Sequence, residues 1–442
     1  MKHKIKSLEE RRMSYNILLF TIVFALVGGV KSIVGDAYRS YLRLSNKAAS
    51  DDLSMLIGFA MLILVIALLA VKWFGHKKVF IAIAISMLIA FILPIYFHSY
   101  LPIAVSSAVL HLGDKAFDIM MALVIMAYTN KDNRIMVFTR VIIINVIVEA
   151  VVSMFDGKLV VWRFKQLLGV SYDKADKLTA HTSKMTPDQL ASYIESYKFV
   201  LWIAVAILVA IIILLAMMKE KREDYRGVQE LTTEKIEKVK FDKSVFKNKY
   251  IVSWVIYSVA MGVESNFITP NLAIYFNRIL HISRGATSTI LSFKSIGMLV
   301  FLLATPFIVK KMGNIKSFAL LIFLSGPVMI VIGMGNIFLP ATAMVMGAAI
   351  FLRYGFTHAV HPVQDSLQLL LVKKENRPVF LAIITGINAV ISIIIGFFGA
   401  KTLFNTARGY HMLFFGFAIV FILCGIMLYV VFDKKYNKTL EY

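Results

Sequence analysis

Charged side chains are scarce in this sequence: Asp, Glu, Lys and Arg make up only 17% of its 442 residues. Soluble globular proteins carry about 25% charged residues, so the composition argues against an ordinary soluble protein. Hydrophobic residues account for 59%. They collect in runs long enough to cross a hydrocarbon core, which takes about 20 residues of helix. We therefore predict an all-α protein that crosses a membrane many times.

Cysteine and catalytic motifs are almost absent as well. The single cysteine, Cys424, excludes a disulfide within the chain. No glycine-rich phosphate loop is present in the sequence, so no ATP-driven step is predicted. Neither a His/Cys cluster at metal-ligand spacing nor a Ser-His-Asp order stands out. We therefore predict no metal site, no cofactor and no enzymatic activity.

Acidic residues are outnumbered: there are 26 Asp and Glu against 48 Lys and Arg, which gives a formal net charge of +22. Nucleic-acid binding would explain such an excess, but the sequence has no RNA-binding motif and no basic face with interleaved aromatics. In membrane proteins, basic residues collect in cytoplasmic loops. We expect the lipid bilayer, and not nucleic acid, to be the partner of this chain.

Twelve apolar runs are visible, six on each side of a charged stretch, 219–249. This division predicts an N-terminal six-helix bundle (1–218), a linker (219–249) and a C-terminal six-helix bundle (250–442). The runs fall at about 14–35, 53–71, 79–98, 102–127, 135–155, 199–218, 250–270, 286–309, 317–334, 338–365, 378–400 and 410–432.

An even number of spans places both termini and the linker on one side. Most Lys and Arg residues outside the spans fall on that side, so the termini are predicted to be cytoplasmic in a plasma or inner membrane. On the other side we expect a long polar loop, 156–198. Within this loop Thr186, Pro187 and Asp188 indicate a helix start, and we expect a short amphipathic helix on the outer surface.

The two halves resemble each other, which indicates an internal repeat. Three pairs of matching residues or segments occur in the same order: Gly29–Ser32 (GVKS) with Gly262–Ser265 (GVES), Gly75 with Gly313, and Asn145 with Asn388. The first pair places Lys31 and Glu264 at equivalent positions. The second lies in basic turns after spans two and eight.

With six plus six spans, a basic central linker and these glycine turns, the whole chain resembles the major facilitator superfamily. The resemblance implies two pseudo-symmetric bundles, a central substrate site, a monomer, and a gating role for the turn residues Gly75, Lys72, Gly313 and Lys310. Lys72 stands where the family's turn usually carries Asp, and the second copy lacks the acidic residue too.

Ionisable residues inside the spans are expensive and usually face a cavity or a partner. We expect Lys31 and Glu264 to form an ion pair across the central cavity; the alternative is that each snorkels towards the membrane surface or pairs with a nearer neighbour. Eight polar residues are predicted to bind substrate: Lys31, Glu264, Asn266, Lys115, Asn145, Asn388, Arg353 and His358.

Span four carries His111, Asp114 and Asp118 on one helical face. Together with His361 of span ten they are predicted to relay protons; the alternative is a static network in which Lys115 neutralises one Asp. His358, His361 and Asp365 share a helical face in span ten, where a metal site is a less favoured reading.

These observations predict a secondary active transporter that moves a small polar solute, anionic or zwitterionic, by alternating access coupled to protons. Two alternatives remain open at this point. One is a proton-driven exporter of drugs or lipids. The other is a protein of a different class, namely a membrane-embedded lipid-modifying enzyme or a non-transporting receptor.

Overall fold

The computed structural model describes residues 2–129, 131–222, 224, 248–372, 377–403 and 406–437. Helices dominate this part of the chain, and all twelve expected spans are helical. The spans are formed by α1 (Lys2–Ile33) with η1 (Val34–Tyr38) and α2 (Arg39–Ser45), α4 (Leu53–Phe74), α5 (His76–Tyr96), α6 (Tyr100–Tyr128), α7 (Lys131–Leu168), α9 (Pro187–Met217), α11 (Lys249–Ile274) with η4 (Tyr275–Ile279), α12 (Arg284–Met312), α13 (Asn314–Gly333), α14 (Thr342–Ala359) with α15 (His361–Leu370), α16 (Arg377–Leu403) and α17 (Ala407–Tyr436).

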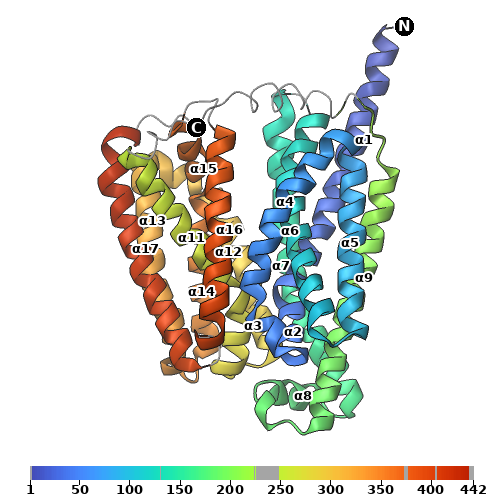
Figure 1. Ribbon diagram of the computed structural model, residues 1–442, viewed down its shortest axis with the longest axis vertical. Helices are drawn as coiled ribbons and strands as arrows, with labels where there is room; N and C mark the ends of the chain where they lie inside the picture. Colours follow the sequence, from blue (N-terminus) through green and yellow to red (C-terminus); the bar gives the residue numbers. More distant parts are fainter. Residues whose placement is uncertain are drawn as a thin grey trace.

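Two bundles stand side by side, with both ends of the chain on one face and α8 (Tyr172–Thr179) on the other (Figure 1). We call these the terminal face and the α8 face. Buried apolar side chains form two clusters, one within residues 19–218 and one within residues 251–432. Each bundle therefore has a hydrophobic core of its own. Most of the predicted linker, residues 225–247, lies outside the described residues.

The internal repeat is visible in the first helix of each bundle. Both of these helices end in a π-helical turn, Val34–Tyr38 in the first bundle and Tyr275–Ile279 in the second. A π-turn inserts an extra residue into a helix and is often found at functional sites. Each turn directly follows the long first helix of its bundle, α1 or α11.

The glycine turns after α4 and α12 also match. Gly75 and Gly313 have φ values of 83° and 87°, a region that residues with a Cβ rarely adopt. After Gly75, the amides of His76 and Lys77 donate to Oε1 of Glu220 at 2.8 and 3.2 Å. The segment after α9 thus supplies a carboxylate at a turn whose own acidic position is occupied by Lys72.

The second turn is capped in the same way, by an amide side chain. The amides of Ile315 and Lys316 donate to Oδ1 of Asn437 at 2.9 and 3.2 Å. In each bundle a residue just after the last helix therefore holds the helix that begins at the turn. Lys310 is exposed beside the second turn, whereas the side chain of Lys72 lies outside the described residues.

The prediction for residues 156–198 was wrong in two respects. Residues 156–168 continue α7, and the helix capped by Thr186 is not a separate surface helix but the start of α9, which runs unbroken to Met217. The capping box at Thr186 and Gln189 is present as the sequence indicated. After Pro187 no helix-breaking residue interrupts the chain, so the polar segment joins the apolar span in one helix.

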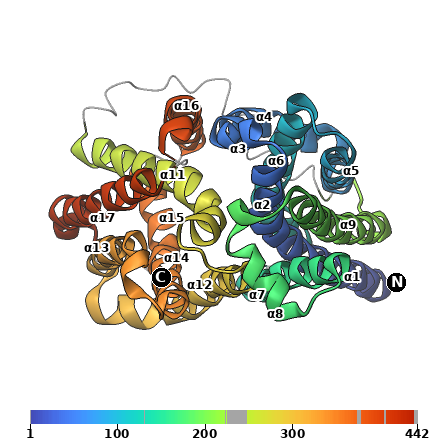
Figure 2. The ribbon, with the colours of Figure 1, turned by 90° about the horizontal axis from the view of Figure 1, so that it is seen from below.

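The two bundles touch mainly along two helix pairs, α7 with α12 and α4 with α16 (Figure 2). Both contacts depend on glycine. A Cβ on Gly396 of α16 would lie 2.4 Å from the Met55 backbone nitrogen, and one on Gly157 of α7 would lie 2.7 Å from the Arg284 carbonyl oxygen. Both contacts lie towards the α8 face, so the bundles approach each other closely there.

Candidate functional site

A small cavity of about 60 Å³ lies between the two bundles. Residues of α1, η1, α2 and α7 line it from the first bundle, and residues of α11, α12 and α14 from the second. Its charged lining residues are Lys31, Asp36, Arg39, Glu149 and Lys294. A water molecule occupies about 30 Å³ in the liquid, so the cavity is too small for a sugar-sized solute in this conformation.

On the side of the first bundle, Lys31 of α1 is held by two carboxylates of α6. Its ammonium group is hydrogen bonded to Asp118 and lies 3.7 Å from Asp114. One turn further along α6, Nε2 of His111 lies 2.9 Å from the Arg39 guanidinium. The structure therefore brings His111, Asp114 and Asp118 together along one stretch of α6, as the spacing predicted.

One ion pair joins the two bundles at this cavity. Nζ of Lys294 in α12 donates to Oε1 of Glu149 in α7 at 3.2 Å, with 31% and 12% of the respective side chains exposed. The Lys294 ammonium also lies 5.5 Å from the centre of the Tyr354 ring. Because the pair connects the halves, any motion that separates α7 from α12 must break it.

The predicted pair between Lys31 and Glu264 is not formed. Lys31 pairs within the first bundle, whereas Glu264 of α11 is hydrogen bonded to Arg353 of α14 and is 5% exposed. The physical reason is proximity: each charge finds an opposite charge on a helix of its own bundle. The open alternative, pairing with a nearer neighbour, is the arrangement in the structure.

The two matched asparagines lie in helix contacts and not in the cavity lining. Asn145 is buried and donates from Nδ2 to the Phe24 carbonyl at 2.5 Å, which fastens α7 to α1. Asn388 lies against Gly262, so it occupies the equivalent contact between α16 and α11. Their equivalence is thus structural, and the prediction that they contact substrate has no support from these positions.

The remaining predicted binding residues lie at different distances from the cavity. Asn266 donates to Ser392 at 2.5 Å, and its carbonyl accepts from Ser54 of the other bundle at 3.0 Å. Lys115 is exposed on α6. His358 lies next to the cavity residue Tyr354, whose carbonyl is 3.0 Å from its Nδ1.

His361 is exposed on α15, with its ring centre 4.9 Å from that of His358. The side chain of Asp365 lies outside the described residues, so the three-residue face of span ten is described only in part. His361 and Asp118 come from different bundles, and no hydrogen bond or ion pair joins them among the described residues. A relay between them remains a prediction.

Sequence reasoning missed a buried cluster between the cavity and the α8 face, at Arg284. Its guanidinium lies 2.5 Å from Asp36 and 3.5 Å from Asp156, and all three side chains are almost completely buried. The Arg284 backbone amide donates to Oγ1 of Thr179 at 2.8 Å. Asp156 and Arg284 had been assigned to loops, and only the extended helices α7 and α12 reveal that both are inside the fold.

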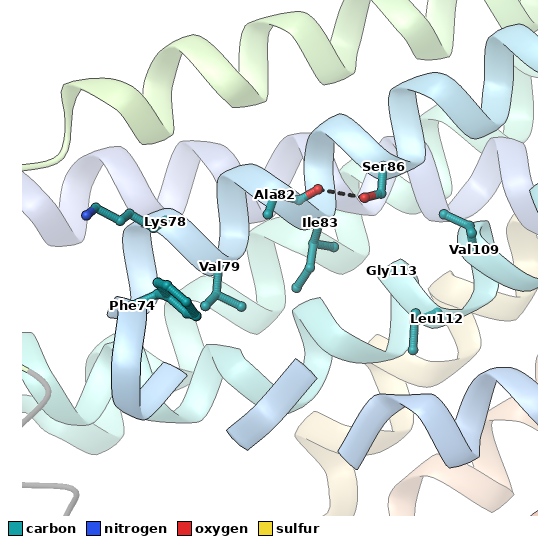
Figure 3. A pocket seen from close by; sticks show the side chains of 9 residues that line it. All are labelled: Phe74, Lys78, Val79, Ala82, Ile83, Ser86, Val109, Leu112 and Gly113. Atoms are coloured by element: carbon teal, nitrogen blue, oxygen red, sulfur yellow. Dashed lines mark hydrogen bonds between the residues drawn. The ribbon is translucent and has the colours of Figure 1, made fainter. Parts of the chain in front are cut away.

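A larger cavity, of about 550 Å³, lies away from the bundle interface, between α5 and α6 (Figure 3). Its walls are apolar apart from Lys78 and Ser86, and the Ser86 hydroxyl donates to the Ala82 carbonyl of its own helix. The cavity contains none of the charges described above. It is a groove suited to an acyl chain and offers little to a polar solute.

Two repeated helix bundles with a charged cavity at their interface are the architecture of membrane transporters. The Major Facilitator Superfamily profile matches residues 17–366, and the chain belongs to that superfamily. A sequence search among curated proteins finds no match.

Solved structures share the fold at low sequence identity. The nucleoside transporter NupG superposes with a TM-score of 0.66 at 16% identity, over 96% of this chain and 99% of that one. The xylose transporter XylE from E. coli, in a partially occluded inward open conformation, superposes with a TM-score of 0.65 at 12% identity, over 98% of this chain and 100% of that one. A bacterial homolog of the human lysosomal transporter Spinster superposes with a TM-score of 0.61 at 11% identity, over 95% of this chain and 96% of that one.

Proposed function

We propose that this protein is a secondary active transporter that moves a small anionic or zwitterionic solute by alternating access. In this proposal the bundles formed by residues 1–218 and 250–442 rock about the central cavity, and the linker 219–249 lies in the cytoplasm with both termini. One observation carries the proposal: the ion pair Glu149–Lys294 joins the two bundles at a cavity lined by charges from both.

The cavity lining favours the class of solute. Lys31, Arg39 and Lys294 supply two ammonium groups and a guanidinium, and Asp36 and Glu149 supply two carboxylates. A zwitterion or an organic anion can satisfy such groups when the halves separate and the Glu149–Lys294 pair opens. A hydrophobic cation would leave Lys294, once parted from Glu149, and Arg39, which faces His111, without an anionic partner in a desolvated site, which is costly.

Coupling to protons is supported by the arrangement around Lys31. One ammonium group serves two carboxylates, Asp114 and Asp118, so the three groups together carry one negative charge. A single proton would neutralise this excess, and buried uncompensated charge is unfavourable in a membrane protein. Asp118 is the better candidate to exchange that proton with water because 40% of its side chain is exposed, against 20% for Asp114.

The test is transport by purified protein in proteoliposomes, with and without a pH gradient. We expect anionic or zwitterionic solutes to accumulate only under the gradient. Asp118→Asn is expected to abolish accumulation and to leave exchange of solute across the membrane largely intact. Glu195→Gln, which removes a carboxylate from an exposed position on α9, serves as the control.

Two results would count against the proposal. Undiminished accumulation by both the Asp118→Asn and the Asp114→Asn proteins would show that the carboxylates at Lys31 do not couple transport to protons. Gradient-driven movement of hydrophobic cations or lipids, without movement of polar solutes, would favour the exporter instead.

A further inference from the structure

A third cavity, of about 340 Å³ and basic in its lining, opens on the α8 face and shares no lining residue with the central one. Its lining residues come from α2, α9 and the chain that links α8 to α9 in the first bundle, and from α11, η4 and α17 in the second. Ligand pockets commonly occupy about 300–1,000 Å³, so it has the size of a small-molecule site. Neither the proposed transport mechanism nor the proton relay uses it.

Both bundles contribute cationic or hydrogen-bonding groups to this cavity. Arg43, His181 and Ser183 come from the first bundle, and Arg278 and His281 come from the second. The rings of His181 and His281 lie 5.0 Å apart, centre to centre, across the junction. The cavity therefore presents donors from both sides of the junction to whatever occupies it.

The charges in this cavity are not balanced. Arg43 is paired with Asp51. Arg278 is half-buried, forms no ion pair within the described part of the chain, and lines the same cavity as the like charge of Arg43. A guanidinium in such a setting gains a charge-assisted, bidentate partner when an oxyanion binds.

The backbone conformation of His281, which lines this cavity, also supports a ligand site there. His281 adopts φ = 53°, in the left-handed region, although it is not glycine. Its Nδ1 lies 3.3 Å from the Ala180 carbonyl of the other bundle. Residues held in that region cost of order 1–3 kcal/mol and cluster at ligand sites; here the conformation turns the ring toward the junction.

We propose that this basic cavity binds an oxyanion, a phosphate or carboxylate group, between Arg278 and the residues of the first bundle. An anion held by both halves stabilises the conformation in which the α8 face is closed, because a ligand favours the state that binds it more tightly. The site is separate from the central cavity and does not depend on which solute the protein transports.

The experiment uses the full-length protein in nanodiscs of neutral phosphatidylcholine, titrated with inorganic phosphate by calorimetry against matched chloride. We expect binding by the unmodified protein. Arg278→Gln should weaken it about tenfold or more, since one charge-assisted hydrogen-bonding partner is lost. Arg408→Gln removes an exposed arginine from the same face, outside the cavity lining, and should bind as the unmodified protein does.

A second arm distinguishes a free anion from a lipid headgroup. In nanodiscs that contain phosphatidylglycerol and no phosphate, a rise in melting temperature that Arg278→Gln abolishes would identify the lipid phosphodiester as the occupant. Binding of inorganic phosphate in neutral nanodiscs would identify a free anion. An absence of both effects overturns the proposal, and so does an equal loss in Arg278→Gln and Arg408→Gln, which would reflect surface charge alone.

Ser183→Glu keeps the proposal testable if Arg278→Gln does not fold. Ser183 is exposed at the mouth of the cavity, so the substitution should leave the fold intact. It places a carboxylate where the anion would enter, and it should reduce binding of phosphate to an undetectable level. Phosphate binding that survives this change would show that the anion is held elsewhere.

Discussion

Removal of the Arg284 guanidinium is predicted to open the α8 face. Arg284 is 1% exposed and faces two carboxylates, Asp36 at 2.5 Å and Asp156 at 3.5 Å. Arg284→Met leaves both carboxylates buried without a cation, and removing one partner of a buried pair typically costs about 3–5 kcal/mol. Because Asp36 and Asp156 belong to the first bundle and Arg284 to the second, separation of the bundles relieves this cost by admitting water.

Two measurements check this prediction in the purified protein. Melting temperature should fall, and the distance between spin labels at the exposed positions Lys174 and Arg408, one on each bundle, should lengthen. The double variant Arg284→Met, Asp36→Asn should recover part of the stability, since it leaves one buried carboxylate in place of two. Arg163→Met is the matched control. An unchanged label distance together with zero coupling in the double-mutant cycle would refute the reasoning.

Two further predictions concern contacts between the bundles. Exchange of charges in Glu149→Lys, Lys294→Glu should restore stability lost in either single variant, because the pair crosses the interface at 3.2 Å; independent effects in a thermal double-mutant cycle would contradict this. Gly396→Leu should shift spin labels on the α8 face apart and lower transport, because even a Cβ would lie 2.4 Å from Met55 N. Gly416→Leu, where nothing lies within 4 Å of an added Cβ, should change neither quantity.

The twelve spans and the repeat were predictable because both depend on local sequence. Apolar runs of span length directly indicate membrane-spanning helices. The glycines at positions 75 and 313 indicate turns with a backbone conformation that other residues rarely adopt. The grouping of His111, Asp114 and Asp118 followed from helical spacing alone. The partners of these groups were harder to predict, because a charged side chain within a span can reach several neighbouring helices.

The buried cluster at Arg284 was missed because sequence reasoning made the helices too short. Span one was expected to end at about residue 35 and span five at about residue 155, so Asp36 and Asp156 both fell outside the expected spans. Arg284 was placed in a loop for the same reason, just before span eight. In the structure Asp36 lies in the π-turn that continues α1, Asp156 lies within α7, and Arg284 is the first residue of α12, so the three charges become buried partners. Polarity near a helix end therefore marked the bundle interface here, and not the membrane surface.

The ion pairs reveal a symmetry that the sequence match only suggested. In the first bundle a cation on the first helix, Lys31, pairs with an acid on the fourth, Asp118; in the second, an acid on the first helix, Glu264, pairs with a cation on the fourth, Arg353. Both bundles therefore pair the first helix with the fourth, but the signs of the two charges are exchanged between the bundles. Since each pair closes within its bundle, neither has to break when the halves move apart. Charge pairs that cross the interface, Glu149–Lys294 and Asp36–Arg284, must break, and they are therefore the contacts whose strength sets the balance between open and closed states.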